Sequence, residues 1–414
     1  MSNKSCNFAE RTNALYFLVG ENYFPGQRKL FSWSEKKFFP VREIYPTNKK
    51  EKKHNRQLMD IQQSRVRIKD IAEMAGVSVG TVDRVLHGRA NVSKLSLEKV
   101  EKVLEEIKYE PNHYASALAS NKTYKFAAII PMHEEDSYWA RVEKGLHEGV
   151  KRYTDFKLSF KVFYYDQFNE DSFEQQTRNL LAYKPTAVII GPIFNNLLMT
   201  KFTKKLESRN LPYSLLDSYW PDFNPVSFYG QDAERSGAFS ARVLLMAAAA
   251  SKKIALFKMM GEGRVASRQQ LGREKGFREY VAKHSPETRI IDHNLYVYDK
   301  VGVIDSLREF FTKHPDIEYG ISFNSSIHVI GDFLKHEMPD HHHICLMGYD
   351  AIEANIRCLR EGYVDFLIGQ HPQQQGLNCF RSIVNSCVLQ VKQTVVHYVG
   401  IDLLMTENID FYKD

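Results

Sequence analysis

The stretch 66–107 has apolar residues at every third or fourth position, which is the spacing of amphipathic helices. Gly76 interrupts it, because glycine readily adopts the left-handed conformation that ends a helix. Ser78 and Ser93 have side-chain oxygens that can cap the helices that follow them. The pattern therefore predicts three short helices around one small core. The apolar positions are Ile68, Ile71, Ala72 and Ala75, then Val82 and Val85, then Val100, Val103, Leu104 and Ile107.

Only residues 76–78 separate the first predicted helix from the second, over 79–86. Helices joined by so tight a turn must cross steeply, so the start of the second helix projects from the body. The side chains that this helix does not need for the core are small at first and then polar, as entry into a DNA major groove requires. They are Val79, Gly80, Thr81, Asp83 and Arg84. The pattern is typical of a helix-turn-helix with a DNA recognition helix, although three short helices also occur in purely structural bundles.

A further short helix is expected within 112–124, after Pro111 interrupts the chain. It has few apolar residues and is too short to be stable alone. Its packing partner is therefore expected outside the three-helix unit.

From Tyr124 onward, apolar runs typical of strands buried on both faces alternate with amphipathic helices. The strands form two successive series, and the second opens near Gln231. We therefore expect an α/β fold of two doubly wound parallel-sheet lobes, with a ligand cleft between them beyond the carboxyl ends of the strands. The strand-forming runs are KFAAIIP, LSFKVFYYD, TAVIIGP and PYSLLD, then KKIALFK, RIIDHNLYV, YGISFN, HICLMGYD and DFLIGQ.

Polar and aromatic side chains recur where these strands end. Each alone is typical of ordinary surface, but their recurrence at one edge favours a binding site. Aromatic faces stack on the C–H surfaces of sugars, while polar groups pair with hydroxyls that would otherwise be buried without partners. The predicted ligand is a mono- or small oligosaccharide, neutral because an acid and a guanidinium offset each other in the site. The candidate residues are Tyr138, Trp139, Asp217, Trp220, Arg273, Asn324, Asp350 and Gln370.

Composition changes this picture only at the N-terminus. The net charge is +6, but residues 1–65 contain 13 Lys and Arg against 6 Asp and Glu, so the remainder is close to neutral. This basic, aromatic-rich segment has no sustained period, and we expect a disordered extension rather than an arm that grips phosphates. A start at Met59 would leave a short lead before the first helix, which is a third possibility.

Other classes of protein find little support in the sequence. No apolar run is long enough to span a bilayer and the N-terminus lacks an export signal, so a cytoplasmic location is expected. The five cysteines lack metal-ligand spacing and are expected to be reduced thiols. His341, His342 and His343 are consecutive in a polar loop and do not predict a metal site. The run MMGEGRVAS lacks the Lys-Ser/Thr of a phosphate loop. No catalytic group, metal or cofactor is therefore proposed.

The run DIAEMAGVSVGTVDRVLHGRANVS, followed by EKV and YEPNHYASALA, resembles the headpiece and hinge helix of LacI/GalR-family repressors. The resemblance implies that Val79, Gly80 and Arg84 face bases, that Ser78 and Thr81 face phosphates, and that His87 and Asn91 lie at the edge of the DNA site. It also implies that the hinge helix forms only on DNA and inserts Leu118 into the minor groove. Asp83 departs from the commoner Ser, and either accepts from a cytosine amino group or fixes Arg84 by a salt bridge.

Residues 125–390 resemble the effector domain of that family, which is similar to periplasmic ribose-binding proteins. The resemblance implies sugar contacts by Arg273, Asn324, Asp350 and Gln370. Ser325 departs from the usual Asp after Asn324, which leaves the identity of the ligand open. The implied protein is a nucleoid-associated homodimer that binds a palindromic DNA operator under the control of a small sugar effector. The alternative is a sugar-binding protein for uptake, which would need an export signal and no headpiece.

The expected domain division has four parts. They are an extension over 1–65, a headpiece over 66–111, a hinge helix and linker over 112–124, and a two-lobed effector and dimerisation domain over 125–414. The first lobe is expected to take about 125–230 with 371–390, and the second 231–370 with 391–414.

Overall fold

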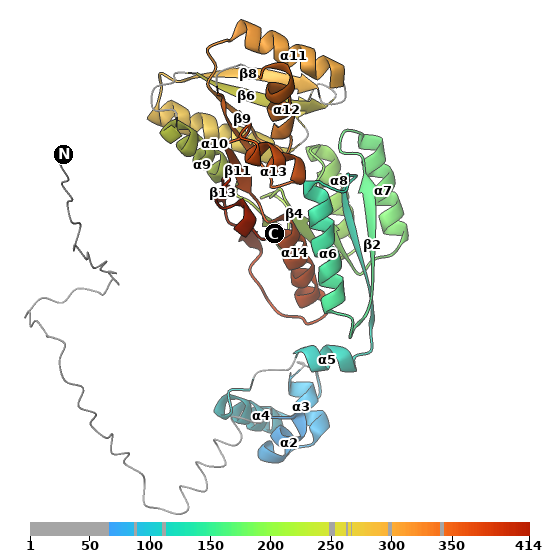
Figure 1. Ribbon diagram of the computed structural model, residues 1–414. Helices are drawn as coiled ribbons and strands as arrows, with labels where there is room; N and C mark the ends of the chain where they lie inside the picture. The colour runs from blue at the N-terminus through green and yellow to red at the C-terminus, as the bar shows by residue number, and fades with distance from the viewer. Residues whose placement is uncertain are drawn as a thin grey trace, which may run out of the picture. The chain divides into compact units, whose positions relative to one another are not determined.

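The computed structural model describes residues 66–86, 89–109, 113–247, 253–261, 264–265, 267–296, 300–339 and 343–414. The expected N-terminal extension, the DNA-edge residue His87, and His341 and His342 lie outside the described residues. The chain divides between Tyr109 and Glu110 into two compact units, each of which is described by itself (Figure 1).

The described residues of the first unit form three helices, as the apolar spacing predicts. They are α2 (Ile68–Ala75), α3 (Val79–Leu86) and α4 (Lys94–Glu106). Ile71, Val82 and Val100, one from each helix, have no solvent exposure and form the centre of the core. Gly76 adopts the left-handed conformation with φ +61° and ends α2. The hydroxyl oxygen of Ser93 caps α4 by accepting from the backbone N–H of Ser96 at 3.2 Å.

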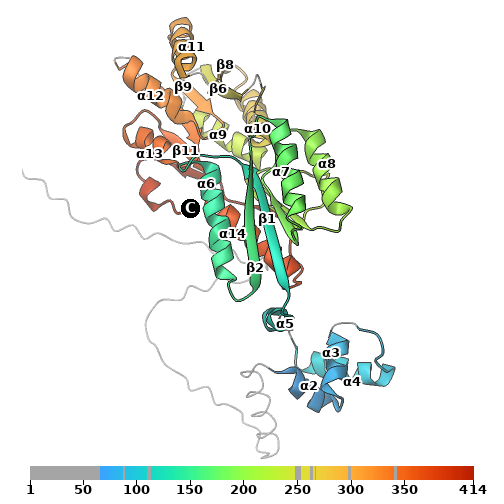
Figure 2. The same cartoon turned by 90° about the vertical axis from the view of Figure 1, so that its right-hand side faces the viewer.

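The second unit begins with α5 (His113–Ala119) and continues into two sheets (Figures 1 and 2). The first sheet is parallel throughout, in the order β12-β5-β4-β3-β1-β2. Its strands are β1 (Thr123–Pro131), β2 (Lys157–Tyr165), β3 (Ala187–Ile190), β4 (Tyr213–Leu216), β5 (Ser227–Gly230) and β12 (Val396–Tyr398). In β3, β4 and β5 every residue is buried, which matches strands covered on both faces.

The second sheet has the order β13-β11-β10-β9-β6-β7, with β8 also paired to β6. The outer strands β7 and β13 are antiparallel to their neighbours, so the sheet is mostly rather than wholly parallel. Its strands are β6 (Lys253–Gly261), β7 (Arg264–Val265), β8 (Arg289–Tyr296), β9 (Tyr319–Ser322), β10 (Cys345–Tyr349), β11 (Phe366–Gly369) and β13 (Asp402–Leu404).

Helices cover both sheets, as the predicted alternation of strands with amphipathic helices requires. Around the first sheet lie α6 (Tyr138–Arg152), α7 (Glu170–Ala182), α8 (Asn196–Glu207) and α14 (Pro372–Cys387). Around the second lie α9 (Ala233–Ala247), α10 (Arg268–His284), α11 (Lys300–Lys313), α12 (Ile327–Glu337) and α13 (Glu353–Arg360), with a final 3-10 turn η1 (Ile409–Phe411). None of the described helices is both long and apolar enough to cross a membrane.

Two helix pairs approach so closely that only glycine fits between them. A Cβ at Gly145 of α6 would lie 1.9 Å from the carbonyl oxygen of Gln373 in α14, and one at Gly276 of α10 would lie 1.9 Å from that of Glu234 in α9. Each pair lies side by side in Figures 1 and 2. The close packing gives each lobe one rigid helix pair beside the chain crossovers.

The assignment of 391–414 to the second lobe is wrong for part of this segment. β12 pairs in parallel with β5 of the first sheet, while β13 pairs with β11 of the second. The sequence pattern also missed β5, whose four residues lie between two turns and immediately before the first residue expected in the second series. Strands this short gain their stability from long-range pairing, which leaves little trace in the local pattern.

Candidate functional site

The start of α3 is exposed, as the proposed recognition helix requires. Val79 has 49% of its surface exposed although its side chain is apolar, and Gly80 and Arg84 are also exposed. Thr81 is partly buried, and its hydroxyl lies 2.9 Å from that of Ser78. These side chains of α3 therefore have few packing partners within the first unit.

Asp83 has a partner that sequence reasoning did not name. Its carboxylate accepts from the Arg89 guanidinium at 3.0 Å. This pair joins the recognition helix to the segment that leads to α4. Asn91 in that segment is exposed and takes the left-handed conformation with φ 71°, which Asn tolerates better than most residues.

The short helix α5 has a buried side and an exposed side. Ala117 is 9% exposed and belongs to the core of the first lobe, whereas the next residue, Leu118, is 41% exposed. The Tyr114 ring packs edge-to-face on Phe156 at 4.8 Å between centroids. The packing partner of α5, expected outside the three-helix unit, is thus the first lobe of the second unit. The exposed Leu118 side chain remains available for other contacts.

A buried polar network lies at the strand ends of the second lobe. Arg273, 3% exposed, donates from Nη1 to the carbonyl oxygen of Phe323 at 2.9 Å and from Nη2 to Oε1 of Gln370. Its guanidinium carbon lies 4.1 Å from the ring centroid of Tyr349. The Gln370 amide donates in turn to Oδ1 of Asp350 at 2.7 Å. Three predicted site residues, Arg273, Gln370 and Asp350, are therefore linked by consecutive hydrogen bonds.

Ser325, which stands where an Asp is expected after Asn324, contacts Asp350. Its hydroxyl donates to Oδ2 of Asp350 at 2.6 Å, so both oxygens of this carboxylate accept hydrogen bonds. The neighbouring Asn324 uses its side-chain oxygen to accept from the hydroxyl of Ser322 and from the backbone N–H of Ser326, each at 3.0 Å. The Asn324 oxygen is thus engaged in shaping the loop after β9.

Asp217 and Asp350 occupy corresponding places in the two lobes, directly after β4 and β10. Both adopt the left-handed conformation, with φ 65° and 70°. The amide of Asn355 holds the second of these turns, since it lies 2.9 Å from the carbonyl oxygens of Tyr349 and Asp350. Burial raises the pKa of both carboxyl groups, because desolvation outweighs the attraction of the Arg273 guanidinium.

Gln269 holds the backbone of Asp217 by a hydrogen bond to its carbonyl group. It lies one helical turn before Arg273 in α10, is 5% exposed, and donates to the carbonyl oxygens of Asp217 and Gln231. Both acceptors are carbonyl groups, so the amide nitrogen must face them and the amide oxygen must point away. Gln269 was missed because a Gln near a helix start is unremarkable in sequence.

The predicted aromatic residues are largely enclosed. Tyr138, 8% exposed, donates to Oε1 of Gln375 at 3.0 Å and meets Trp139 edge-to-face at 5.2 Å. Trp220 is 3% exposed, stacks on Phe223 at 5.0 Å, and has the Arg268 guanidinium carbon 4.3 Å from its ring centroid. The Trp220 ring therefore has no exposed face in this structure on which a sugar stacks.

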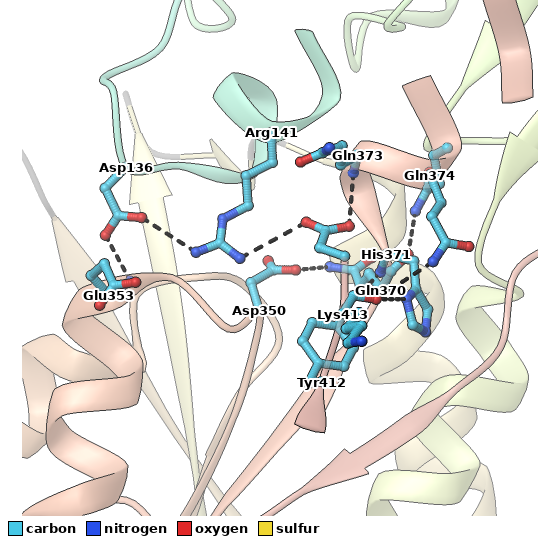
Figure 3. Close-up of polar contacts among 12 residues, drawn as sticks. Asp136, Arg141, Asp350, Glu353, Gln370, His371, Gln373, Gln374, Tyr412 and Lys413 are labelled. Atoms are coloured by element: carbon cyan, nitrogen blue, oxygen red, sulfur yellow. Dashed lines mark hydrogen bonds and ion pairs between the residues drawn. The ribbon is translucent and has the colours of Figure 1, made fainter. Parts of the chain in front are cut away.

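Charged residues that the sequence did not indicate lie near Asp350 and Gln370 (Figure 3). Arg141 of α6 lies 3.7 Å from Asp136 and 3.8 Å from Asp414. Asp136 also accepts from the backbone N–H of Glu353, at the start of α13, at 2.8 Å. Oδ1 of Asp414 accepts from the backbone N–H of Gln373 at 2.8 Å. These contacts join the first lobe, the second lobe and the segment after η1.

Five buried side-chain polar atoms among the described residues have no hydrogen-bond partner, and three of them belong to α10 and the loop after β4. These three are Nε1 of Trp220, Oε1 of Gln269 and Nε of Arg273. Leaving a buried polar atom unpaired costs about 1–3 kcal/mol. Two are donors and one is an acceptor, so the arrangement suits a ligand that carries hydroxyl groups. The described residues include no group of His, Cys, Asp and Glu side chains arranged to hold a metal ion.

Comparison with known families assigns two parts of the chain. Residues 67–112 match the lacI family of bacterial regulatory proteins, and residues 126–387 match the periplasmic binding protein domain. The chain is 29% identical over 148 residues to the HTH-type transcriptional regulator IdnR of Escherichia coli, which is 36% of this chain and 42% of that protein. The match thus spans less than half the length of this curated relative.

Solved structures are similar over the second unit. A protein from Bacteroides fragilis, assigned to the LacI transcriptional regulators, is 36% identical with a TM-score of 0.67, over 70% of this chain and all of that chain. GanP, a glucose-galactose binding protein from Geobacillus stearothermophilus, is 18% identical with a TM-score of 0.59, over 69% of this chain and 99% of that one. The second similarity shows a shared fold alone.

Proposed function

The chain belongs to the lacI family of bacterial regulatory proteins and carries a periplasmic binding protein domain, and on that premise we propose that it regulates transcription in response to a sugar. The observation that carries the proposal is one chain with both an exposed recognition helix and a buried polar network built at strand ends. Its matched families are binding proteins, and it is not an enzyme.

The proposed DNA contacts lie on α3 and α5. Val79, Gly80 and Arg84 read bases, Ser78 and Thr81 contact phosphates, and His87 and Asn91 lie at the edge of the site. Asp83 either accepts from a cytosine amino group or fixes Arg84 by a salt bridge. Leu118 enters the minor groove as an apolar wedge. One recognition helix reads few bases, so a homodimer on a palindromic operator supplies the rest, and the nucleoid is the expected location.

The proposed effector is a mono- or small oligosaccharide held between the lobes. The first lobe contributes Asp217, Tyr138, Trp139 and the unpaired indole N–H of Trp220 rather than its ring face. The second contributes Arg273, Asn324 and Asp350, with Gln370 near the crossover. The name of GanP, a glucose-galactose binding protein of the same fold, supports this class of ligand. A sugar-binding protein for uptake is the alternative, and the matched headpiece disfavours it.

Regulation requires that the sugar bind two states of the lobes with different affinity. Closure of the lobes would then change the separation of the two headpieces in the dimer. The family allows either sign, release of DNA or tighter binding.

The test measures both activities on the full chain. Operators are selected from random duplexes at about 150 mM salt, where non-specific binding is already weakened. Binding of the selected duplex is then measured by fluorescence anisotropy, with and without sugars that stabilise the protein in a thermal-shift screen. Sequence-specific binding that a stabilising sugar changes severalfold supports the proposal. Equal affinity for all duplexes, or DNA binding that no stabilising sugar alters, contradicts it.

A further inference from the structure

The charged groups of the cleft are unevenly balanced. The cleft carboxylates are the four side chains of Asp136, Asp217, Asp350 and Asp414. Two guanidiniums, those of Arg141 and Arg273, lie among them. Asp350 is close enough to both Arg141 and Arg273 for each to act on its titration, and to Asp217 and Asp414 for it to act on theirs. Four acidic side chains therefore lie among two guanidiniums, and His371 also acts on Asp414.

The inner guanidinium is already committed to the protein. Arg273 donates one N–H of Nη1 to Phe323 and one N–H of Nη2 to Gln370, while its Nε has no partner within the described residues. An anionic ligand group is best held by two parallel N–H donors of one guanidinium. A ligand anion at Arg273 would also meet the Asp350 carboxylate, which lies close enough to Arg273 for the guanidinium to lower its pKa and is bonded to the same Gln370 amide.

The outer guanidinium is flanked by acids on both sides. Arg141 lies between Asp136 and Asp414, at 3.7 and 3.8 Å (Figure 3). A ligand carboxylate or phosphate at this point would meet two like charges together with one opposite charge. Arg268 and Lys413 lie nearby in the chain, but both are exposed, where water and salt screen their charges.

Asp217 is one of two cleft carboxylates without an ion pair within the described residues. Asp350, the other, accepts hydrogen bonds on both oxygens, and Asp136 and Asp414 both have Arg141. Asp217 accepts from the hydroxyl of Ser218 at 2.8 Å, and the Arg273 guanidinium and the Tyr138 hydroxyl also lower its pKa against the effect of burial. A ligand donor, either a hydroxyl or an ammonium group, would supply what this carboxylate lacks.

We infer that the cleft selects its ligand by charge: it accepts a neutral sugar or an amino sugar and excludes sugar acids and sugar phosphates, and Asp217 sets this preference. The inference rests on the proposed function of the cleft as the effector site. It narrows the ligand to a chemical class that the resemblance to the family leaves open.

The test uses sugars that share one ring and differ only in charge. D-glucose, D-glucosamine and D-glucuronate form one set, and D-galactose, D-galactosamine and D-galacturonate form the second. Their affinities for the full chain are measured by calorimetry near neutral pH, after a thermal-shift screen. We expect the acid to bind at least about tenfold more weakly than the neutral or amino sugar of its set, the size expected of one unscreened like charge.

Variants separate a charge effect from a loss of structure. Asp217→Asn removes the charge and keeps a residue that tolerates the left-handed conformation. In this variant the affinities for the sugar acid and for the neutral sugar of one set should differ by no more than about threefold. Asp222→Asn is the matched control, since Asp222 is exposed in the same loop, and it should leave this difference in affinity unchanged. Asp414→Asn provides a second variant if Asp217→Asn does not fold, and it should narrow the difference in the same direction.

The outcomes distinguish this inference from the proposed function. If a sugar acid binds wild-type protein as tightly as its neutral counterpart, the charge selection is wrong while the sugar-responsive regulator stands. If the difference in affinity between sugar acid and neutral sugar persists in both Asp217→Asn and Asp414→Asn, these carboxylates do not select the ligand by charge. If none of the six sugars stabilises wild-type protein, the inference fails together with the proposed class of effector.

Discussion

Tyr114 and Asp155 tie the short helix α5 to the first lobe, because the Tyr114 hydroxyl donates to the Asp155 carboxylate at 2.6 Å. The Tyr114 ring also packs on Phe156. α5 carries Leu118, the proposed minor-groove wedge. We therefore expect this contact to pass a shift of the first lobe to the wedge.

Removal of this hydroxyl should weaken the coupling between sugar and DNA. In Tyr114→Phe the ring contact remains but the hydrogen bond is lost, so we expect the sugar-dependent change in operator affinity to fall by about threefold, within the usual range of coupling energies. The measurement is anisotropy of labelled operator with and without sugar. Tyr153→Phe is the control, because Tyr153 packs on the same Phe156 ring without bonding to α5. Equal loss in both variants would argue against a specific tie.

Loss of Arg84 should relax sequence preference. The side chain is exposed on α3, so Arg84→Ala is expected to fold normally, while a lost bidentate base contact costs about 1–3 kcal/mol of discrimination. Affinities for the selected operator and for a single-base variant of each half-site give the discrimination directly. Lys99→Ala on α4, also exposed, serves as the control. An unchanged footprint on the operator in Arg84→Ala would rule out base reading by this residue.

Truncation of Leu118 should weaken specific binding without destabilising the protein. Leu118 is 41% exposed, so its loss removes little buried surface from the protein itself, whereas a minor-groove wedge is buried only in the complex. Thermal unfolding and operator affinity of Leu118→Ala are measured together. Leu95→Ala on α4 is the matched exposed leucine, at 64% exposure, and should change neither quantity. The wedge is refuted if the two variants bind the operator equally well.

Arg273→Ala and Asp350→Ala should each abolish stabilisation by sugar. Both residues belong to the buried network that includes Gln370, and removal of either leaves a buried partner unpaired. A sugar at about a hundred times its dissociation constant adds roughly 2.7 kcal/mol to the unfolding free energy of wild-type protein, which a thermal-shift assay resolves easily. Arg278→Ala on the same helix is the control, since Arg278 pairs with Glu274 outside the network. A shift that persists in both cleft variants would place the pocket elsewhere.

The pH dependence of stability should report the buried carboxyl group of Asp217. Burial on folding raises its pKa above the ordinary value of 3.8, so the folded state holds this proton more tightly than the unfolded state. The stability that this group contributes is therefore present at low pH and is lost as pH rises through its folded-state pKa. Asp217→Asn should raise the unfolding temperature of the unliganded protein at neutral pH and reduce its decline with rising pH above about 4. Parallel pH profiles for wild type and variant would show that the carboxyl group is not penalised by burial.

The sequence by itself determined the elements that depend on near neighbours. The first three helices follow from apolar spacing, from Gly76 as a terminator and from Ser93 as a cap, all of which act within a few residues. The strand-end positions of Asp217 and Asp350 were also predictable, because polar groups directly after buried runs meet at one edge of a parallel sheet.

Only the tertiary structure decided which distant residues meet. β12 joined the first sheet rather than the second, and Asp414 near the end of the chain came to lie beside Arg141, which also lies near Asp136 in the first lobe. Ser325 appeared in sequence as a missing acid, and the fold made it the donor that holds Asp350. Such contacts join residues tens to hundreds of positions apart, and their energies depend on burial and geometry that no local pattern records.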